Sequence, residues 1–164
     1  MANNYFYYQE TSRYKHDNCV FISHQKRDAK ECRKIADYLR SKGIDVYFDE
    51  YDTSIDRSNP DSVVSAIKRG IDFSKYMLCV VSSNTLASSW VPWEVGYGYD
   101  KTELAILTLK GIDDNSLPEY LRASYVKRNF FGLSQFINRI RPSVITEGEI
   151  RYFSASNPLY DILD

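Results

Sequence analysis

Short apolar segments alternate along this chain with segments whose apolar residues recur every three or four positions. The first kind is typical of buried strands, and the second marks one face of an amphipathic helix. Residues 19–23 form such an apolar run, and Ala29, Cys32, Ala36 and Leu39 then follow at helical spacing. The same pattern predicts further strands at residues 44–48, 76–81, 104–109 and 125–126, and further helices at 63–71, from 90 onward and at 133–140.

This alternation, with strands that are short and apolar, favours a parallel sheet covered by helices on both faces. Five such units predict an α/β fold of the flavodoxin-like type, which is a doubly wound, five-stranded parallel sheet of order 2-1-3-4-5 in a three-layer αβα arrangement. Ligands of this fold bind beyond the carboxyl ends of the strands, where the order reverses between strands 1 and 3. The candidate positions are therefore those that follow the first three strands: Ser23, His24, Asp49, Ser82 and Ser83.

The connections between these segments carry their own signals. Gly43 can end the first helix. Asp61 is expected to cap the second helix and Ser89 the third. The polar stretch Glu50–Pro60 is longer than most loops in compact domains. We expect this stretch to form a mobile lid or a contact surface over the ligand crevice.

Composition narrows the class of protein further. The 164 residues suit a single domain, and 21 Lys and Arg against 22 Asp and Glu leave a net charge of −1, which argues against a dedicated nucleic-acid binder. The three cysteines and two histidines do not form a zinc-binding pattern. No signal peptide opens the chain, and the longest apolar run, Met77–Val81, is too short for a membrane span. We therefore expect a cytoplasmic protein with buried, reduced cysteines and no contact with nucleic acid or membrane.

The residues at the strand ends exclude several doubly wound families. A phosphoacceptor domain needs acidic residues after strands 1 and 3, where this chain has Ser-His and Ser-Ser. The segment 23–28 contains no glycine, which excludes a dinucleotide-binding Gly-x-Gly-x-x-Gly motif and a P-loop at this place. A Gly-x-Ser-x-Gly nucleophile elbow is also absent, so a serine hydrolase with His24 as its base is not expected.

The remaining motifs resemble a TIR domain of the bacterial branch. Five of them occur in order: Val20–His24 (Val-Phe-Ile-Ser-His), Ile35–Leu39, Val46–Asp49, Ser82–Ser83 and Ser89–Val95 (Ser-Trp-Val-Pro-Trp-Glu-Val). The resemblance covers about residues 19–140 and implies a flavodoxin-like fold and, in many members, cleavage of NAD. One loop departs from the family pattern, because residues 50–60 contain Pro60 but lack the glycine of the Pro-Gly pair that mediates homotypic contacts in many members.

With this resemblance the chain divides into three parts. Residues 1–18 are expected to form an N-terminal arm, residues 19–142 the TIR domain, and residues 143–164 a C-terminal tail packed on or near the domain.

Glu94 is the residue of this constellation that suits NAD cleavage. The bond to be broken joins a ribose carbon to a cationic pyridinium, so nicotinamide leaves as a neutral molecule and needs neither a general acid nor a metal ion. The reaction does need a negative charge that stabilises the oxocarbenium-like ribosyl centre and an acceptor that orients the ribose hydroxyls. Glu94 can supply both from the start of the third helix. The alternative interpretation is a glutamate that only complements the helix dipole.

Five residues are expected to bind the substrate around Glu94: His24, Asp49, Ser82, Ser83 and Trp90. Trp90 precedes Glu94 by four residues and shares its helix face, where the ring can stack on adenine or nicotinamide or pack in the core. His24 and Asp49 can hold ribose or phosphate, although Asp49 also suits a strand-end turn. The two serines can present hydroxyl or N–H groups or cap the next turn. Trp93 is interpreted as structural, and the basic residues from Lys26 to Lys34 as a solvated helix face.

The predicted function is that of an enzyme that consumes NAD as a substrate, without a cofactor or metal, and releases nicotinamide with ADP-ribose or a cyclic ADP-ribose isomer. The resemblance further implies a signal in Thoeris-type anti-phage defence, self-association through TIR–TIR contacts and a separate effector protein that senses the product. Two other functions remain open: a non-catalytic TIR–TIR scaffold, and an enzyme similar to nucleoside deoxyribosyltransferases. Turnover of NAD separates the first alternative from the predicted enzyme.

Overall fold

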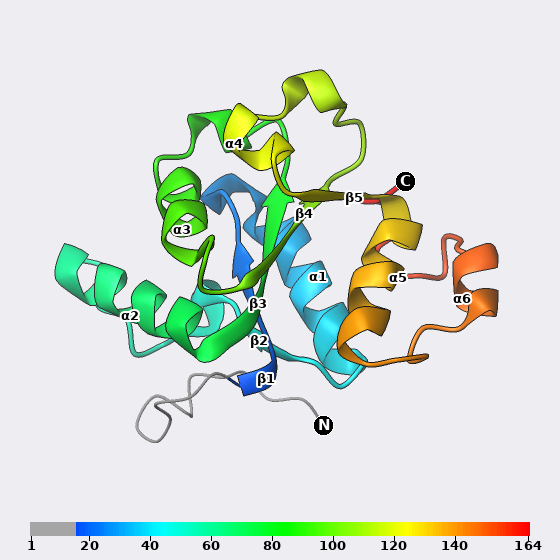
Figure 1. The fold of residues 1–164 in the computed structure, drawn as a ribbon, viewed down its shortest axis with the longest axis horizontal. Helices are drawn as coiled ribbons and strands as arrows, with labels where there is room; N and C mark the ends of the chain where they lie inside the picture. The colour runs from blue at the N-terminus through cyan, green and yellow to red at the C-terminus, as the bar shows by residue number, and fades with distance from the viewer. Residues whose placement is uncertain (1–15) are drawn as a thin grey trace.

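The computed structural model describes residues 16–164 and contains a five-stranded sheet of order β2-β1-β3-β4-β5 (Figure 1). All neighbouring strands run parallel. The strands are β1 (His16–Ser23), β2 (Asp45–Tyr47), β3 (Ser74–Val81), β4 (Glu103–Thr108) and β5 (Tyr125–Arg128). The flavodoxin-like strand order that the sequence pattern predicted is thus confirmed. Residues 1–15 of the expected N-terminal arm lie outside the described residues. Its remaining residues, 16–18, belong to β1.

Helices cover both faces of the sheet (Figure 1). The α-helices are α1 (Ala29–Ser41), α2 (Pro60–Phe73), α3 (Trp90–Gly98), α4 (Glu119–Arg122), α5 (Asn129–Ile140) and α6 (Glu147–Arg151). Short 3-10 helices are η2 (Lys26–Asp28), η3 (Asp49–Tyr51), η4 (Thr85–Ala87) and η5 (Asp114–Ser116). Buried residues of α1 and α5 pack on one face of the sheet, and those of α2, α3 and α4 pack on the other. The result is the three-layer αβα arrangement.

Side chains of β1 alternate between these two layers. Val20 and Ile22 belong to the core on the α1 side, whereas Cys19 and Phe21 belong to the core on the α2 side. Because helices cover both faces, both sets are apolar, and the strand therefore appears in the sequence as a continuous apolar run. The central strand β3 follows the same rule, with Cys79 fully buried. All three cysteines of the chain are buried and free of disulfides, as expected.

Two strands are longer than the apolar pattern predicts, because their first residues are polar. β1 begins at His16 and β3 at Ser74, where the pattern indicated residues 19 and 76. The buried Ser74 hydroxyl donates a hydrogen bond to the carbonyl of Gly70 at 2.7 Å. This bond satisfies a polar group inside the layer, which is why the strand tolerates it.

The starts of α2 and α3 differ from the predicted caps. The side chain of Asn59, rather than that of Asp61, caps α2 by accepting a hydrogen bond from the Asp61 N–H at 3.0 Å. Pro60 takes the first helical position, which needs no N–H partner. At α3, Ser89 occupies the cap position but makes no side-chain cap bond; the N–H of Val91 donates to the Ser88 hydroxyl at 3.1 Å.

The C-terminal segment 143–164 packs against α1 and α5. Four of its apolar side chains are buried in that core: Ile145, Leu159, Ile162 and Leu163. The segment also contains α6, which the sequence pattern did not predict and which begins with a reciprocal capping box between Thr146 and Glu149. Within residues 16–164, no helix combines the length and the apolar character that crossing a bilayer requires.

Candidate active site

A cavity of about 600 Å³ opens where the ends of β1 and β2 face the beginning of α3. It therefore lies at the reversal of strand order, where the fold is expected to bind ligands. Its volume is within the range of small-molecule sites. Polar residues dominate its wall: His24, Gln25, Lys26, Asp49, Glu50, Arg57, Ser88, Ser89 and Glu94; the apolar members are Pro60, Val63, Ile67, Ala87 and Trp90.

Glu94 is the most deeply placed acid of the cavity. Its side chain lies in the second turn of α3 with only 6% of the residue exposed. Burial raises the pKa of Glu94 well above its ordinary value, and the negative charge of Asp49 raises it further. Within residues 16–164, no basic side chain forms an ion pair with this carboxyl group. A ligand with a positive charge would stabilise the ionised form of such a buried carboxyl group strongly.

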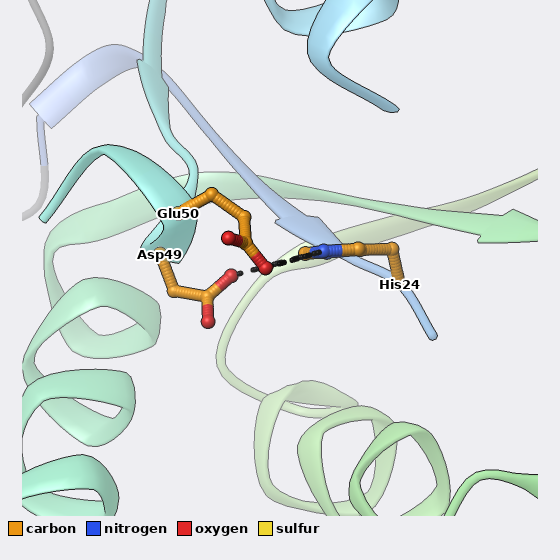
Figure 2. A group of neighbouring side chains, drawn as sticks. All are labelled: His24, Asp49 and Glu50. Carbon is orange, nitrogen blue, oxygen red and sulfur yellow. Dashed lines mark ion pairs between the residues drawn. The ribbon is translucent and has the colours of Figure 1, made fainter. Parts of the chain in front are cut away.

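His24 points at two acids that follow β2, as Figure 2 shows. Its Nε2 lies 3.9 Å from Asp49 Oδ1 and 3.9 Å from Glu50 Oε1. The His24 side chain is 5% exposed and packs against Phe48, with 4.7 Å between ring centroids, so its position is set by the core. The nearby imidazole lowers the pKa of Glu50, against the opposite effect of its partial burial. The structure thus brings His24 and Asp49 together at the cavity, as predicted, and adds Glu50.

Arg57 reaches into the cavity from the loop that follows η3. Its Nη1 lies 3.0 Å from Asp49 Oδ2, and its Nη2 donates to the backbone carbonyl of Asp49. The guanidinium therefore neutralises Asp49 while its side chain stays half exposed. Lys26 on η2 supplies a second cation to the wall. These two residues give the cavity a basic side next to its acidic one.

The loop that carries Arg57 is anchored at its centre. Asp52 is buried and accepts hydrogen bonds from the Tyr47 hydroxyl, at 2.8 Å, and from the N–H of Ser54, at 3.0 Å. Ile55 is buried as well. Within Glu50–Pro60 the longest continuously exposed stretch is residues 56–60, so we expect the mobile part of the predicted lid to be shorter than Glu50–Pro60.

The structure does not place Ser82 or Ser83 in the wall of the cavity. The Ser82 hydroxyl donates to the buried carboxylate of Asp28 at 2.5 Å, and the Asn84 amide donates to the same carboxylate at 2.7 Å. These bonds join the turn after β3 to the end of η2. Ser82 thus holds the β3 turn and Ser83 is exposed, and a role of the two serines in substrate binding stays a prediction.

His24, Asp49 and Glu50 are also a set of residues that could hold a metal ion. One ligand atom from each lies within 4.8 Å of the others, and an imidazole with two carboxylates suits several divalent cations. Arg57 forms an ion pair with Asp49, and His24 Nε2 lies 3.9 Å from an oxygen of each acid. These contacts hold the three side chains together without a metal.

Fold and cavity together define a doubly wound α/β protein with a carboxylate-lined cavity at its switch point. The family model for the TIR domain matches residues 20–140. The chain belongs to the TIR domain family.

Two relatives have significant sequence similarity to this chain. The protein named probable 3′ cyclic ADP-D-ribose synthase ThsB′, of Bacillus cereus (strain MSX-D12), is 35% identical over 109 residues, which are 62% of this chain and 56% of the relative. The 2′ cyclic ADP-D-ribose synthase BtTIR of Bacteroides thetaiotaomicron is 29% identical over 76 residues, which are 46% of this chain and 25% of the relative. This chain thus spans about half of the first relative and a quarter of the second.

A solved structure supports the fold. The TIR domain of the Toll-related receptor TRR-2 from Hydra magnipapillata superposes with a TM-score of 0.60, over 77% of this chain and 99% of that domain. Its sequence identity is 14%, so the similarity concerns the fold alone.

Several cavity residues were not identified from the sequence. Glu50 and Arg57 lie in the polar stretch that the sequence predicts as a lid or contact surface without singling out any of its residues, and Lys26 is predicted on a solvated helix face. Only their positions in the sequence could have indicated a place in the site. Glu50 adjoins Asp49 at a strand end, and Arg57 is the sole basic residue between Glu50 and Pro60. Which of them faces the cavity depends on how the loop folds back over β2.

Proposed function

We propose that this TIR domain consumes NAD, breaking the bond between nicotinamide and ribose and releasing nicotinamide with a cyclic ADP-ribose isomer or ADP-ribose. The observation that carries the proposal is Glu94, a buried carboxyl group in a cavity at the switch point that forms no ion pair with any basic side chain of residues 16–164. The names of the two relatives, both cyclic ADP-ribose synthases, support the same chemistry.

Electrostatics explains how Glu94 acts in this reaction. When the cationic end of NAD enters the cavity, its positive charge lowers the pKa of the neighbouring carboxyl group and favours the ionised form. As the bond to nicotinamide breaks, the positive charge moves from the pyridinium ring to the ribosyl carbon. A carboxylate beside the ribose therefore stabilises the transition state more than the bound substrate, and the buried setting strengthens the interaction.

The other cavity residues divide into an acidic and a basic group. Asp49 and Glu50, with His24, offer acceptors and a donor for ribose hydroxyls. Arg57 and Lys26 offer positive charge for the pyrophosphate, and Trp90 offers a ring face for stacking. The reaction in this scheme needs no metal, because the departing nicotinamide is neutral and needs no Lewis acid.

The incoming nucleophile decides the product. Water at the ribosyl carbon gives ADP-ribose, whereas a group on the adenosine half of the same molecule gives a cyclic isomer. We propose that the product serves as a signal in anti-phage defence and is sensed by a separate effector protein, with self-association of TIR domains as part of the active state. A scaffold without turnover is the alternative, and it assigns no role to the charge of Glu94.

Glu94→Gln tests the proposal, because it keeps the size and hydrogen bonding of the side chain and removes its charge. We expect kcat for nicotinamide release to fall about 10²–10³-fold while KM changes little. Products are to be identified by liquid chromatography and mass spectrometry, in buffer containing EDTA so that the proposed metal independence is tested as well.

Glu119→Gln is the matched control, since Glu119 is a glutamate of a different helix whose side chain is 95% exposed. This variant should cleave NAD at the wild-type rate. A folded Glu94→Gln protein with wild-type turnover would exclude the mechanism, and a wild-type protein without any turnover would favour the scaffold.

A further inference from the structure

A second cavity, of about 520 Å³, adjoins the candidate active site between α2 and α3. Its lining consists of Val64, Lys68, Ser89, Trp90, Trp93 and Tyr97, and we call it the aromatic groove. Ser89 and Trp90 also line the candidate active site. The two cavities therefore share part of their walls.

Three aromatic rings of α3 form a continuous series along this groove. The Trp90 and Trp93 rings meet edge to face with 5.8 Å between centroids, and the Trp93 and Tyr97 rings stack at 5.7 Å with an interplanar angle of 13°. Trp90 is 40% exposed, and the other two rings are half-buried. The interpretation of Trp93 as purely structural is therefore incomplete, because its ring also lines the open groove.

The far end of the groove is positively charged and held in place. Lys68 Nζ lies 5.6 Å and Lys101 Nζ 4.2 Å from the centre of the Tyr97 ring. The Tyr97 hydroxyl donates to Asp72 at 2.9 Å, which fixes the orientation of the ring. A flat π-system would find complementary ring faces along this series.

We propose that the aromatic groove binds the adenosine half of NAD, with adenine stacked on the Trp93–Tyr97 part of the series. This inference rests on the proposed function, which places the nicotinamide end beside Glu94. Trp90 and Tyr97 are seven residues apart, or about 10 Å along the helix axis, so the series extends well beyond the active site. Each of the two cavities has a volume suited to one small-molecule moiety, and NAD consists of two nucleotide halves.

This placement holds the adenine at a distance from the ribosyl carbon beside Glu94. The groove thus contributes to substrate affinity rather than to the bond-breaking step. Its residues should affect KM and leave kcat nearly unchanged.

Direct binding of AMP tests the groove independently of NAD cleavage. Both tryptophans of the chain line the groove, so their intrinsic fluorescence reports its occupancy. We expect AMP to change the fluorescence of the wild-type protein saturably. Tyr97→Ala, which retains both tryptophans, should weaken AMP binding about tenfold. Tyr152→Ala, an aromatic of the C-terminal segment that is 73% exposed, should leave it unchanged.

Initial rates with NAD provide the second readout. Trp93→Ala should raise KM about tenfold with kcat within about twofold of wild type, and Trp93→Phe should restore most of the affinity. Absence of AMP binding to the wild type, or equal AMP affinity in Tyr97→Ala, overturns the proposal. A change in sedimentation coefficient in Trp93→Ala, together with unchanged AMP affinity, also overturns it and identifies the groove as a contact between two copies of the chain.

The two proposals fail separately. A wild-type protein that binds AMP through Tyr97 but releases no nicotinamide would refute the proposed activity and leave the nucleotide-binding groove in place.

Discussion

Burial changes the contribution of Glu94 to the stability of this protein. Its position near the start of a helix predicts a small stabilising effect of about 0.3–1 kcal/mol through the helix dipole. In the structure the residue is only 6% exposed, and burial raises its pKa. Ionising this side chain therefore costs folding free energy, which is opposite in sign to the dipole effect. A residue kept at a cost to stability is typical of a functional site.

Glu94→Gln should therefore raise the free energy of unfolding, and the gain should depend on pH. Below the pKa of an unfolded glutamate, about 4.3, the side chain is protonated in both states and the gain is small. Above that pH the unfolded chain loses the proton and the folded chain retains it, so wild-type stability falls as pH rises toward the raised pKa of Glu94. Above the raised pKa the gain is constant.

Urea denaturation of wild type and Glu94→Gln between pH 4 and pH 9 measures this difference. The exposed Glu119→Gln serves as the control and should give a flat difference over the same range. A loss of stability in Glu94→Gln that is equal at all pH values would contradict an ionisation cost at Glu94.

At the scale of elements, the close approach of α2 to β2 shapes the wall of the site. Gly70 makes this approach possible, because a Cβ at its position would lie 2.6 Å from the Tyr47 ring. The Tyr47 ring is itself held by stacking on Phe21 at 5.4 Å and by its hydrogen bond to Asp52. Tyr47 therefore both limits how closely α2 packs on β2 and anchors the loop that carries Arg57.

Gly70→Ala should destabilise the protein by about 1–3 kcal/mol, because the ring cannot move without breaking these contacts. It should also lower NAD affinity by shifting the loop. Gly96→Ala is the control within another helix of the same site, since a Cβ there meets nothing within 4 Å. Alanine at that position should be neutral or stabilising by up to about 1 kcal/mol. Thermal unfolding followed by circular dichroism distinguishes the two, and equal melting temperatures would contradict the steric account.

At the scale of the whole molecule, we expect the protection of backbone amides against hydrogen exchange to fall from the centre of the sheet toward the mouth of the cavity. β3 pairs with β1 on one side and with β4 on the other and is almost fully buried. The exposed stretch 56–60 is held by local bonds, such as that from the Asp56 N–H to the Ser62 hydroxyl at 3.0 Å, and by the contacts of the half-exposed Arg57 with Asp49. Regions with few buried contacts open locally at low free energy.

Hydrogen exchange followed by mass spectrometry should therefore show slow exchange at β3 and fast exchange at residues 56–59 in the free protein. Residues 52–55 should exchange at intermediate rates, because Asp52 and Ile55 are buried. If residues 56–59 were as protected as β3 without ligand, the loop would be a fixed wall and not a lid.

The sequence by itself determined the fold class. Hydrophobic periodicity is a local property, so the alternation of strands and helices could be inferred from residue types and spacing. The strand-end rule of this fold pointed to His24 and Asp49, and the resemblance to TIR domains pointed to Glu94; all three line the same cavity. Gly43 could likewise be placed at the end of α1, where its φ of 82° suits glycine.

Tertiary structure alone decided which polar residues face the cavity. Ser82 and Arg57 occupy similarly polar surroundings in the sequence, yet Ser82 donates to the buried Asp28 while Asp49 holds Arg57 in the wall. The burial of Glu94, the joining of the aromatic groove to the site through Trp90, and the core positions of Leu159 and Leu163 were also decided there. The physical reason is that these properties depend on contacts between segments far apart in the chain, and such contacts leave no periodic pattern in either segment.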